Sequence, residues 1–247
     1  MNGLIKVLPR IIDDIQPDIL CFQEVNCHNI DEIHNVLSKN GYKRLSLFPM
    51  KTRASEQYNL MYFNQQGIEL LEEKCVARGD VEYQSLDKQR IKYGMSDYRT
   101  SLIGLFKKGN KQFLVGSTHT DYISPEGEIR GTIKTINKMD EMTSEMNISK
   151  ILVGDFNMAV HMSEMYVIRQ NINTDWSTVS IPEDEMENYQ SWHGYNTKEK
   201  VNPDFAIIDA RTTEARRTLL DVIHQVEIDG EKIFPSDHHP VLFEIQE

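Results

Sequence analysis

The stretch PDILCFQEV, residues 17–25, is an apolar run that changes to polar side chains at Gln23 and Glu24. Its length and composition predict a buried strand. An apolar repeat of helical period precedes it over residues 4–15 and predicts an amphipathic helix that ends before Pro17. A buried strand that ends in a carboxylate can aim it into a cleft, so Glu24 is a candidate site residue. The alternative is an ordinary carboxylate at a strand end.

Four other short segments place polar side chains beside an apolar strand. Two follow their strand and two precede it: STHTD (117–121) follows 112–117, GDFN (154–157) follows 150–153, NPDF (202–205) precedes 205–208, and SDHHP (236–240) precedes 240–245. Loops held by a rigid sheet are common positions for catalytic groups, so each segment is a candidate contributor to a site.

The residue types in these segments favour metal and proton chemistry. Asp155 and Asn157 lie two apart, so an extended backbone would point both to one side, and their oxygens suit a hard cation such as Mg²⁺. Asp237 beside His238 combines a carboxylate that can hold metal with an imidazole that moves protons near neutral pH. An Asx turn is the alternative for the first pair. His119 is a ligand, a phosphate donor or a satisfied core histidine.

The rest of the pattern predicts an α/β domain with many short strands and few helices. Apolar periodicity predicts helices over 30–39, 127–147 and 162–170, and strands over 58–63, 68–71 and 101–106. Charged and polar composition predicts loops over 74–97 and 171–200, and a strand or a turn of helix over 219–226. The basic clusters at Lys88–Lys92 and Arg211–Arg217 are interpreted as solvated faces.

Composition excludes several classes of protein. The 247-residue chain is 39% hydrophobic and 26% charged, which excludes a collagen-like or wholly disordered chain. Its 27 Lys and Arg against 38 Asp and Glu give a net charge of −11. Such an acidic balance argues against broad, non-specific binding of nucleic acid. It still allows a polyanionic substrate if carboxylates hold divalent cations in a cleft.

Cysteine usage and hydropathy bear on the compartment. Cys21, Cys27 and Cys75 form no CxxC pair, so reduced thiols in a cytoplasmic protein are expected. The first residues lack the apolar centre of a secretory signal, and no stretch approaches the ~20 apolar residues of a membrane span. We therefore expect a cytoplasmic monomer without a membrane span.

In this order, and over residues 17–241, the five segments resemble the motifs of the endonuclease/exonuclease/phosphatase superfamily, the DNase I-like proteins. SWHGY (191–195) also resembles a segment of small bacterial members. The resemblance implies one domain over residues 1–247 of α+β class. Its architecture would be a four-layer α/β/β/α sandwich of two mostly antiparallel sheets, with the site at one end.

The resemblance also implies a metal site. Glu24 and Asp237 would hold Mg²⁺ or Mn²⁺. Asp155 and Asn157 would lie beside the metal or the scissile phosphate. A divalent cation would neutralise charge on the phosphoryl oxygens and polarise the leaving oxygen.

The catalytic roles that the resemblance implies centre on a carboxylate–histidine pair. His238 would take the proton of the attacking water, and Asp204 would fix its tautomer and stabilise the imidazolium. His119 would contact the phosphate or serve the leaving group. Three further residues would support substrate binding: Arg99, Arg130 and His193.

The start of the chain departs from the family's pattern, which usually opens with a strand ending in an asparagine before the motif Glu. Here the chain begins directly in the predicted helix, and Asn2 is the only asparagine before Glu24. Either the sequence is a shortened product of a longer parent, or the first strand and its ligand have been lost. The first alternative is favoured because losing an interior strand leaves buried backbone groups without partners.

The leading hypothesis for function is a metal-dependent hydrolase of a phosphodiester or phosphomonoester. The substrate would be a small molecule, a lipid head group or nucleic acid. A non-catalytic binding or scaffold protein with a degenerate metal site is the main alternative. A serine hydrolase using Ser117 or Ser236 is weaker, because the chain has no GxSxG motif.

Overall fold

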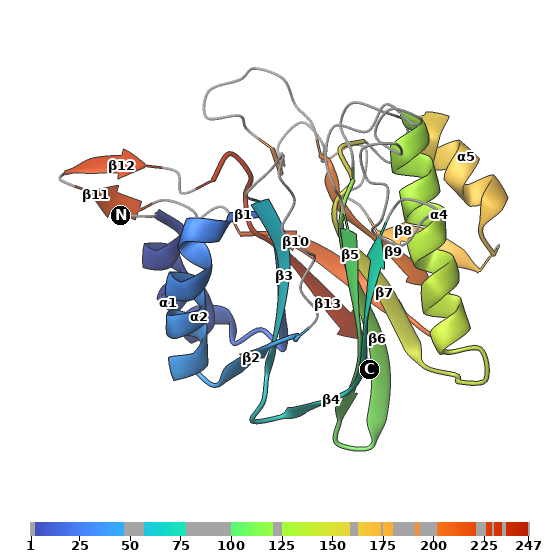
Figure 1. The fold of residues 1–247 in the computed structure, drawn as a ribbon, viewed down its shortest axis with the longest axis horizontal. Coiled ribbons are helices and arrows are strands. Elements are labelled where there is room, and N and C mark those ends of the chain that lie inside the picture. The colour runs from blue at the N-terminus through green and yellow to red at the C-terminus, as the bar shows by residue number, and fades with distance from the viewer. Residues whose placement is uncertain are drawn as a thin grey trace.

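The structure is a computed structural model, and it has four layers, with helices on both outer faces of two packed β-sheet layers (Figure 1). It describes residues 3–46, 57–77, 100–120, 125–158, 163–173, 175–179, 191–192, 202–220, 226–228, 230–233 and 236–246. This is the predicted α/β/β/α arrangement.

The first half of the chain forms one helical layer and part of the first sheet layer. Helices α1 (Gly3–Ile15) and α2 (Ile30–Lys39) cover a three-stranded antiparallel sheet in the order β1-β3-β2, whose strands are β1 (Ile19–Asn26), β3 (Gln57–Asn64) and β2 (Tyr42–Arg44). A short 3-10 helix, η1 (Cys27–Asn29), joins β1 to α2. Leu8 and Ile12 of α1 pack with Leu37 of α2 against Leu60 of β3, so burial of apolar area holds the helices on this sheet.

The second sheet layer has six strands in the order β4-β5-β6-β7-β9-β8. They are β4 (Ile68–Ala77), β5 (Thr100–Lys108), β6 (Lys111–His119), β7 (Ser149–Asp155), β9 (Asp204–Asp209) and β8 (Trp176–Val179). Neighbours are antiparallel except β6 and β7, which are parallel. A parallel pair requires a crossover, and α4 (Pro125–Met142) supplies it.

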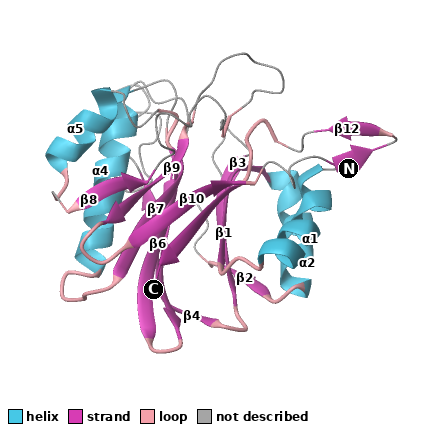
Figure 2. Ribbon diagram, turned by 180° about the vertical axis from the view of Figure 1, so that it is seen from behind, coloured by secondary structure: helices cyan, strands magenta, loops and turns pink. Residues whose placement is uncertain are grey.

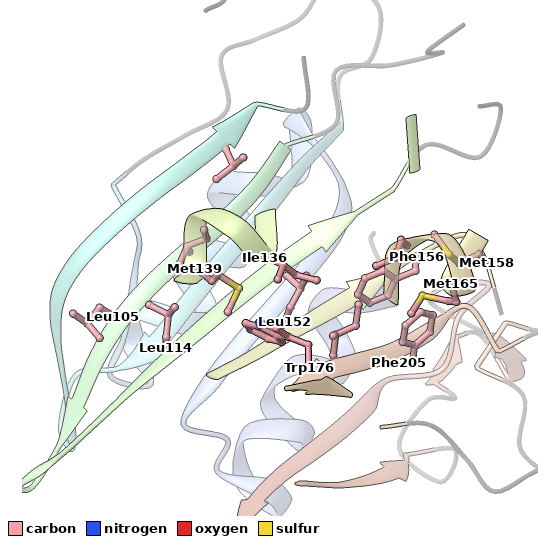
Figure 3. Packing of buried hydrophobic residues seen from close by; sticks show 14 residues of the cluster. Leu105, Leu114, Ile136, Met139, Leu152, Phe156, Met158, Met165, Trp176 and Phe205 are labelled. Carbon is pink, nitrogen blue, oxygen red and sulfur yellow. The ribbon is translucent and has the colours of Figure 1, made fainter. Parts of the chain in front are cut away.

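Helices α4 and α5 (Ser163–Asn171) cover the outer face of the six-stranded sheet. Figure 3 shows the core under them, where Met139 and Ile136 of α4 meet Leu152 of β7. Phe156 stacks on Phe205 with ring centroids 4.1 Å apart, at the end of β7 where the polar segments gather. This stack fixes two of the five sequence segments relative to each other.

Two of the last four strands lie beside the three-stranded sheet and face the six-stranded sheet, and the other two form a hairpin that projects beyond helix α1 (Figure 2). Strand β10 (Glu214–Leu219) pairs antiparallel with β13 (Val241–Gln246), and β11 (Val226–Ile228) pairs with β12 (Glu231–Ile233). Phe243 and Ile245 of β13 pack on the same inner cluster as Ile19 of β1. Both β1 and β13 therefore belong to the first sheet layer.

Several predicted boundaries are wrong. Strand β4 continues to Ala77, into the predicted loop over 74–97, because its outward charges belong to an edge strand that β5 pairs on one side only. Strand β8 lies within residues 171–200, which were expected to be polar and rich in loops. Helix α4 ends at Met142. Strand β10 ends at Leu219 and β11 begins at Val226, and most of the element predicted over 219–226 lies outside the described residues.

None of the helices in the described ranges combines the length and the apolar character that a membrane crossing needs.

Candidate active site

Three of the five sequence segments meet because of the register of β6, β7 and β9. His119 at the end of β6 is the register partner of Asp155 at the end of β7. Asp155 is in turn the partner of Asp204 at the start of β9. The three side chains therefore lie in a row at one end of the six-stranded sheet, although 85 residues separate His119 from Asp204.

Gly154 allows this row to form. Its φ is +150°, and a Cβ at this position would lie 1.9 Å from the backbone oxygen of Thr118 on β6. Only glycine permits so close an approach of the two strands. The turn beyond it is held by two backbone hydrogen bonds, from Thr120 N–H to the Asp155 oxygen and from Phe156 N–H to the Pro203 oxygen.

A carboxylate–histidine pair joins the last segment to this row. His238 Nδ1 lies 2.8 Å from Asp204 Oδ2, and because an ionised carboxylate only accepts, Nδ1 carries the proton. His238 Nε2 then faces Asp155 Oδ2 at 3.7 Å. The backbone of His238 is fixed by a bond to Ser236 Oγ and by a β-bridge to Trp192. The pairing predicted for Asp204 and His238 is present.

Asp155 lies where negative charge is costly. Burial raises its pKa, and repulsion from Asp204 and Glu24 adds to this effect. The attraction of His238 and the N–H of Asn157 oppose the shift, and the pKa reaches about 7. Carboxylates that are buried together without enough positive charge are typical of sites that bind a cation or perform acid–base chemistry.

The same carboxylates hold a proton on His238. Burial lowers its pKa, but the hydrogen bond to Asp204 and the charges of Asp204, Asp155 and Asp237 outweigh burial and raise the pKa to about 9. Without a bound cation, His238 is therefore an imidazolium at neutral pH. It can accept a proton only when further positive charge offsets these carboxylates.

Glu24 reaches this group from the other sheet layer. The side chain of His119 is 2% exposed, and its Nε2 lies 3.7 Å from Glu24 Oε1 and 3.5 Å from Asp155 Oδ2. Glu24 has a φ of +54° and lies in a register break of β1 between Phe22 and Val25. Such bulges and unfavourable backbone angles often redirect side chains at sites.

Asn157 and Asp237 make different contacts. Asp155 Oδ1 accepts the backbone N–H of Asn157 at 2.8 Å, so the Asx turn is present, while Asp155 Oδ2 still faces the two histidines. Asn157 Nδ2 donates to the Thr120 oxygen, which leaves its second N–H for another acceptor. Asp237 Oδ2 accepts from Trp192 Nε1 at 3.2 Å.

The chemistry of the donors fits a hard divalent cation. Asp155, Asp204 and His238 each offer a ligand atom within 4.8 Å of the others. Asp204 Oδ2 and His238 Nδ1 already engage each other in a hydrogen bond, whereas Asp155 Oδ2 and Glu24 Oε1 lie 3.5 Å and 3.7 Å from His119 Nε2. Oxygen ligands with an excess of negative charge suit Mg²⁺ or Mn²⁺.

The residues predicted to bind substrate have different outcomes. Arg99 and His193 lie outside the described residues. Arg130 lies on α4, where its guanidinium pairs with Glu126 one turn earlier at 2.7 Å. Its role in substrate binding stays a prediction.

Sequence reasoning missed the hydrogen bonds that support the segments of the site. Ser191, fully buried, accepts the backbone N–H of Asp204, and Gln23 Nε2 donates to the buried Ser117 Oγ. Arg217 is not part of a solvated face as interpreted: its Nε donates to the Asp204 backbone oxygen and its terminal nitrogens are buried. The alternation in EARRTL, where Ala215 points inward, was the available signal.

Comparison with known proteins gives similarity in structure only. No protein-family model and no curated protein matches the chain. A Bacteroides thetaiotaomicron mannosyl-6-phosphatase, Bt3783, is similar with a TM-score of 0.78 and 16% identity, over 98% of this chain and 90% of that one. An endonuclease/exonuclease/phosphatase from Bacteroides vulgatus has a TM-score of 0.74 and 15% identity over the same shares.

A third similar structure contains nucleic acid. TDP2 of D. rerio, complexed with a single-strand DNA product, has a TM-score of 0.67 and 12% identity over 98% of this chain and 91% of that one. These similarities, the four-layer architecture and the order of the five sequence segments all indicate the same fold. The chain therefore has the DNase I-like fold of the endonuclease/exonuclease/phosphatase superfamily.

Proposed function

We propose that this protein is a phosphoesterase that uses a divalent metal and a histidine-activated water to hydrolyse a phosphodiester or phosphomonoester. One observation carries the proposal: Asp204 holds His238 at 2.8 Å while the other nitrogen of His238 faces the buried Asp155. A histidine oriented by one carboxylate and facing an uncompensated second one suits proton transfer beside a cation.

Glu24 and Asp237 are proposed to hold Mg²⁺ or Mn²⁺, with Asp155 beside them. When bound, the ion supplies positive charge for the phosphoryl oxygens and offsets the carboxylates that keep His238 protonated. The raised pKa of Asp155 supports this assignment, because the protein itself leaves that carboxylate without sufficient positive charge.

The protein's own residues divide the remaining work. His238 Nε2 accepts the proton of the attacking water, and Asp204 stabilises the imidazolium that forms. Asn157 donates its second N–H to a non-bridging phosphoryl oxygen. His119 serves the phosphate or the leaving oxygen, because burial between Glu24 and Asp155 fixes its ring.

The substrate class is proposed to be a small phosphate ester rather than long nucleic acid. Of the similar structures, one is a mannosyl-6-phosphatase and another holds a DNA product, so this fold accommodates both kinds of ligand. The net charge of −11 favours the small substrate, because long polyanions need an extended basic face.

The test is turnover of a panel of phosphomonoesters and phosphodiesters with Mn²⁺ or Mg²⁺. We expect activity that stops in EDTA, and a loss of about 100-fold or more in kcat for His238→Ala and for Glu24→Ala. Lys138→Ala, at a partly exposed residue of α4 paired with Glu141, is the control and should keep full activity. Wild-type rates in both site variants would contradict the assignment.

The same panel separates the alternatives. A scaffold protein with a degenerate site would be folded but inactive on every substrate. A serine hydrolase would keep its activity in EDTA and lose it in Ser236→Ala. Ser117 is a poor nucleophile candidate, because its side chain is fully buried and accepts from Gln23.

A further inference from the structure

Arg217 is partly buried, and the hydrogen bonding of its buried guanidinium is incomplete. Its Nε donates to the backbone oxygen of Asp204 at 3.0 Å. Its two terminal nitrogens are buried and have no hydrogen-bond partner among the residues that the structure describes. Arg211, six residues earlier, differs in burial and in pairing, because it is exposed and forms ion pairs with Asp209 and Asp175.

Strand geometry explains why Arg217 points inward. Side chains alternate along β10, so Glu214 and Arg216 are exposed while Ala215 packs on the cluster between the sheets. Arg217 lies on the same face as Ala215, opposite Phe243 in the pairing with β13. Because β10 contacts β9 across the two layers, the guanidinium lies against the start of β9, where Asp204 begins the strand.

A buried guanidinium with few partners is destabilising by itself. Charge removed from water costs free energy unless opposite charge or hydrogen bonds compensate it. Burial lowers the pKa of Arg217 to about 10, and the charge of Asp204 partly opposes this shift. Arg217 therefore stays cationic at neutral pH. With no ion pair on its terminal nitrogens among described residues, the positive charge acts mainly on Asp204.

We propose that Arg217 is a positioning residue for the Asp204–His238 pair: it holds the Asp204 backbone and places a fixed positive charge behind that carboxylate. The proposal rests on the proposed function of this site. Its consequence is that Asp204, although beside the buried Asp155, stays in place to accept the His238 Nδ1 proton. Arg217 touches neither the water nor the phosphate, so it acts through Asp204.

The first measurement needs no substrate and no metal. The Nδ1–H proton of His238 gives a downfield NMR signal when it is hydrogen-bonded to Asp204, and Asp204→Asn assigns it by removing it. We expect Arg217→Met to broaden this signal or shift it upfield, while Arg217→Lys, which keeps the charge, retains it. Arg216→Met is the matched control: the same substitution on the same strand, facing solvent.

The second measurement is steady-state kinetics with a substrate from the panel. Arg217→Met should lower kcat by about 10-fold to 100-fold, as small misplacements of catalytic groups do, with KM within about twofold of wild type. Arg216→Met should leave both constants unchanged. A rise in KM with unchanged kcat would contradict the proposal, because it would indicate that Arg217 binds substrate directly.

The outcomes distinguish this inference from the proposed function. An unchanged His238 signal in Arg217→Met overturns the role of Arg217, whatever the activity. An inactive wild type overturns the phosphoesterase, while the NMR comparison still decides on Arg217. If Arg217→Met does not fold, Arg217→Gln replaces it, because glutamine donates to the Asp204 oxygen without charge and should weaken the signal more than lysine does.

Discussion

The two ends of β7 and β9 carry charged groups that are arranged in opposite ways. At one end, Lys150 and Asp209 carry opposite charges, and Lys150 Nζ lies 3.2 Å from Asp209 Oδ2. At the other end of the same two strands, Asp155 and Asp204 carry like charges and are direct register partners. One pair of strands therefore contains both a neutralised cluster and a cluster with excess negative charge.

The neutralised end is a closed network. Lys150 pairs with Asp140 at 2.9 Å as well as with Asp209, and its ammonium lies 5.8 Å from the centre of the Trp176 ring. Burial would raise the pKa of Asp209, but hydrogen bonds from Arg211 and the charge of Lys150 outweigh it and lower the pKa. Each charge is compensated within the protein, so this end needs no ligand.

The excess negative charge at the other end is not fully compensated by the described side chains of the protein. Burial and the neighbouring carboxylates raise the pKa of Asp155 to about 7, the opposite direction from Asp209. The comparison separates two kinds of buried carboxylate: Asp209, which the protein's own cations compensate, and Asp155, which they compensate only in part, as is typical of functional sites.

Lys150→Met should have the largest effect, because it leaves Asp209 buried with reduced compensation. We expect a loss of about 3–5 kcal/mol in the free energy of unfolding, measured by urea titration. Lys138→Met removes a partly exposed lysine paired with the exposed Glu141 and should cost less than about 1 kcal/mol. Equal effects in the two variants would remove the distinction between the network and an ordinary surface pair.

Divalent metal should stabilise the opposite end. Mn²⁺ at 100 times its Kd adds about 2.7 kcal/mol to the stability of the folded state, which is about 5–10 °C in Tm. Asp155→Asn should raise the Tm in EDTA by removing buried repulsion, and should lose most of the Mn²⁺ effect. Asp14→Asn, at an exposed carboxylate of α1, should respond to Mn²⁺ as wild type does. An undiminished Mn²⁺ effect in Asp155→Asn would show that metal binds elsewhere.

The smallest expected effect is a dependence of metal-free stability on pH. The pKa of His238 is raised from 6.5 to about 9, so between these values the folded protein holds a proton that the unfolded chain releases. The contribution of His238 to the free energy of unfolding is therefore fully present below pH 6.5. It decreases by about 1 kcal/mol per pH unit between pH 6.5 and pH 9.

Thermal unfolding in EDTA at pH 7 and pH 8 checks this slope. We expect the Tm to fall by about 2–4 °C in wild type. His238→Gln should reduce the fall, and His28→Gln, at an exposed histidine, should keep it. A Tm that rises from pH 7 to pH 8 in wild type would contradict the sign of the shift.

Local patterns in the sequence predicted the main strands and the polar residues at their ends, whereas the four-layer architecture was expected only from the resemblance to a known family. Runs of apolar residues mark β1, β6, β7 and β9, and the polar residues next to them mark the segments of the candidate site. Strands β8 and β10 were missed because their sequences, WSTV and EARRTL, contain few apolar residues and are strands through pairing with neighbours.

Partners across the fold could not be predicted, because they depend on register. Nothing local in the sequence indicates that Ser191 receives the Asp204 N–H, or that Lys150 is buried between two aspartates. Arg217 was assigned to solvent because a run with several basic residues usually lies there. Burial of a single arginine in such a run is decided by the strand's alternation and by the sheet it faces.

The parallel pairing of β6 and β7 has a consequence for folding. His119 and Asp155 become neighbours only after the 35-residue segment between them, including α4, has crossed over and packed on the sheet. Asp204 and His238 come from still later in the chain. Contacts between residues so distant in sequence form late, because the entropy of closing long loops must be overcome first. We therefore expect the cluster of carboxylates to assemble late in folding, after hydrophobic packing can hold the like charges together.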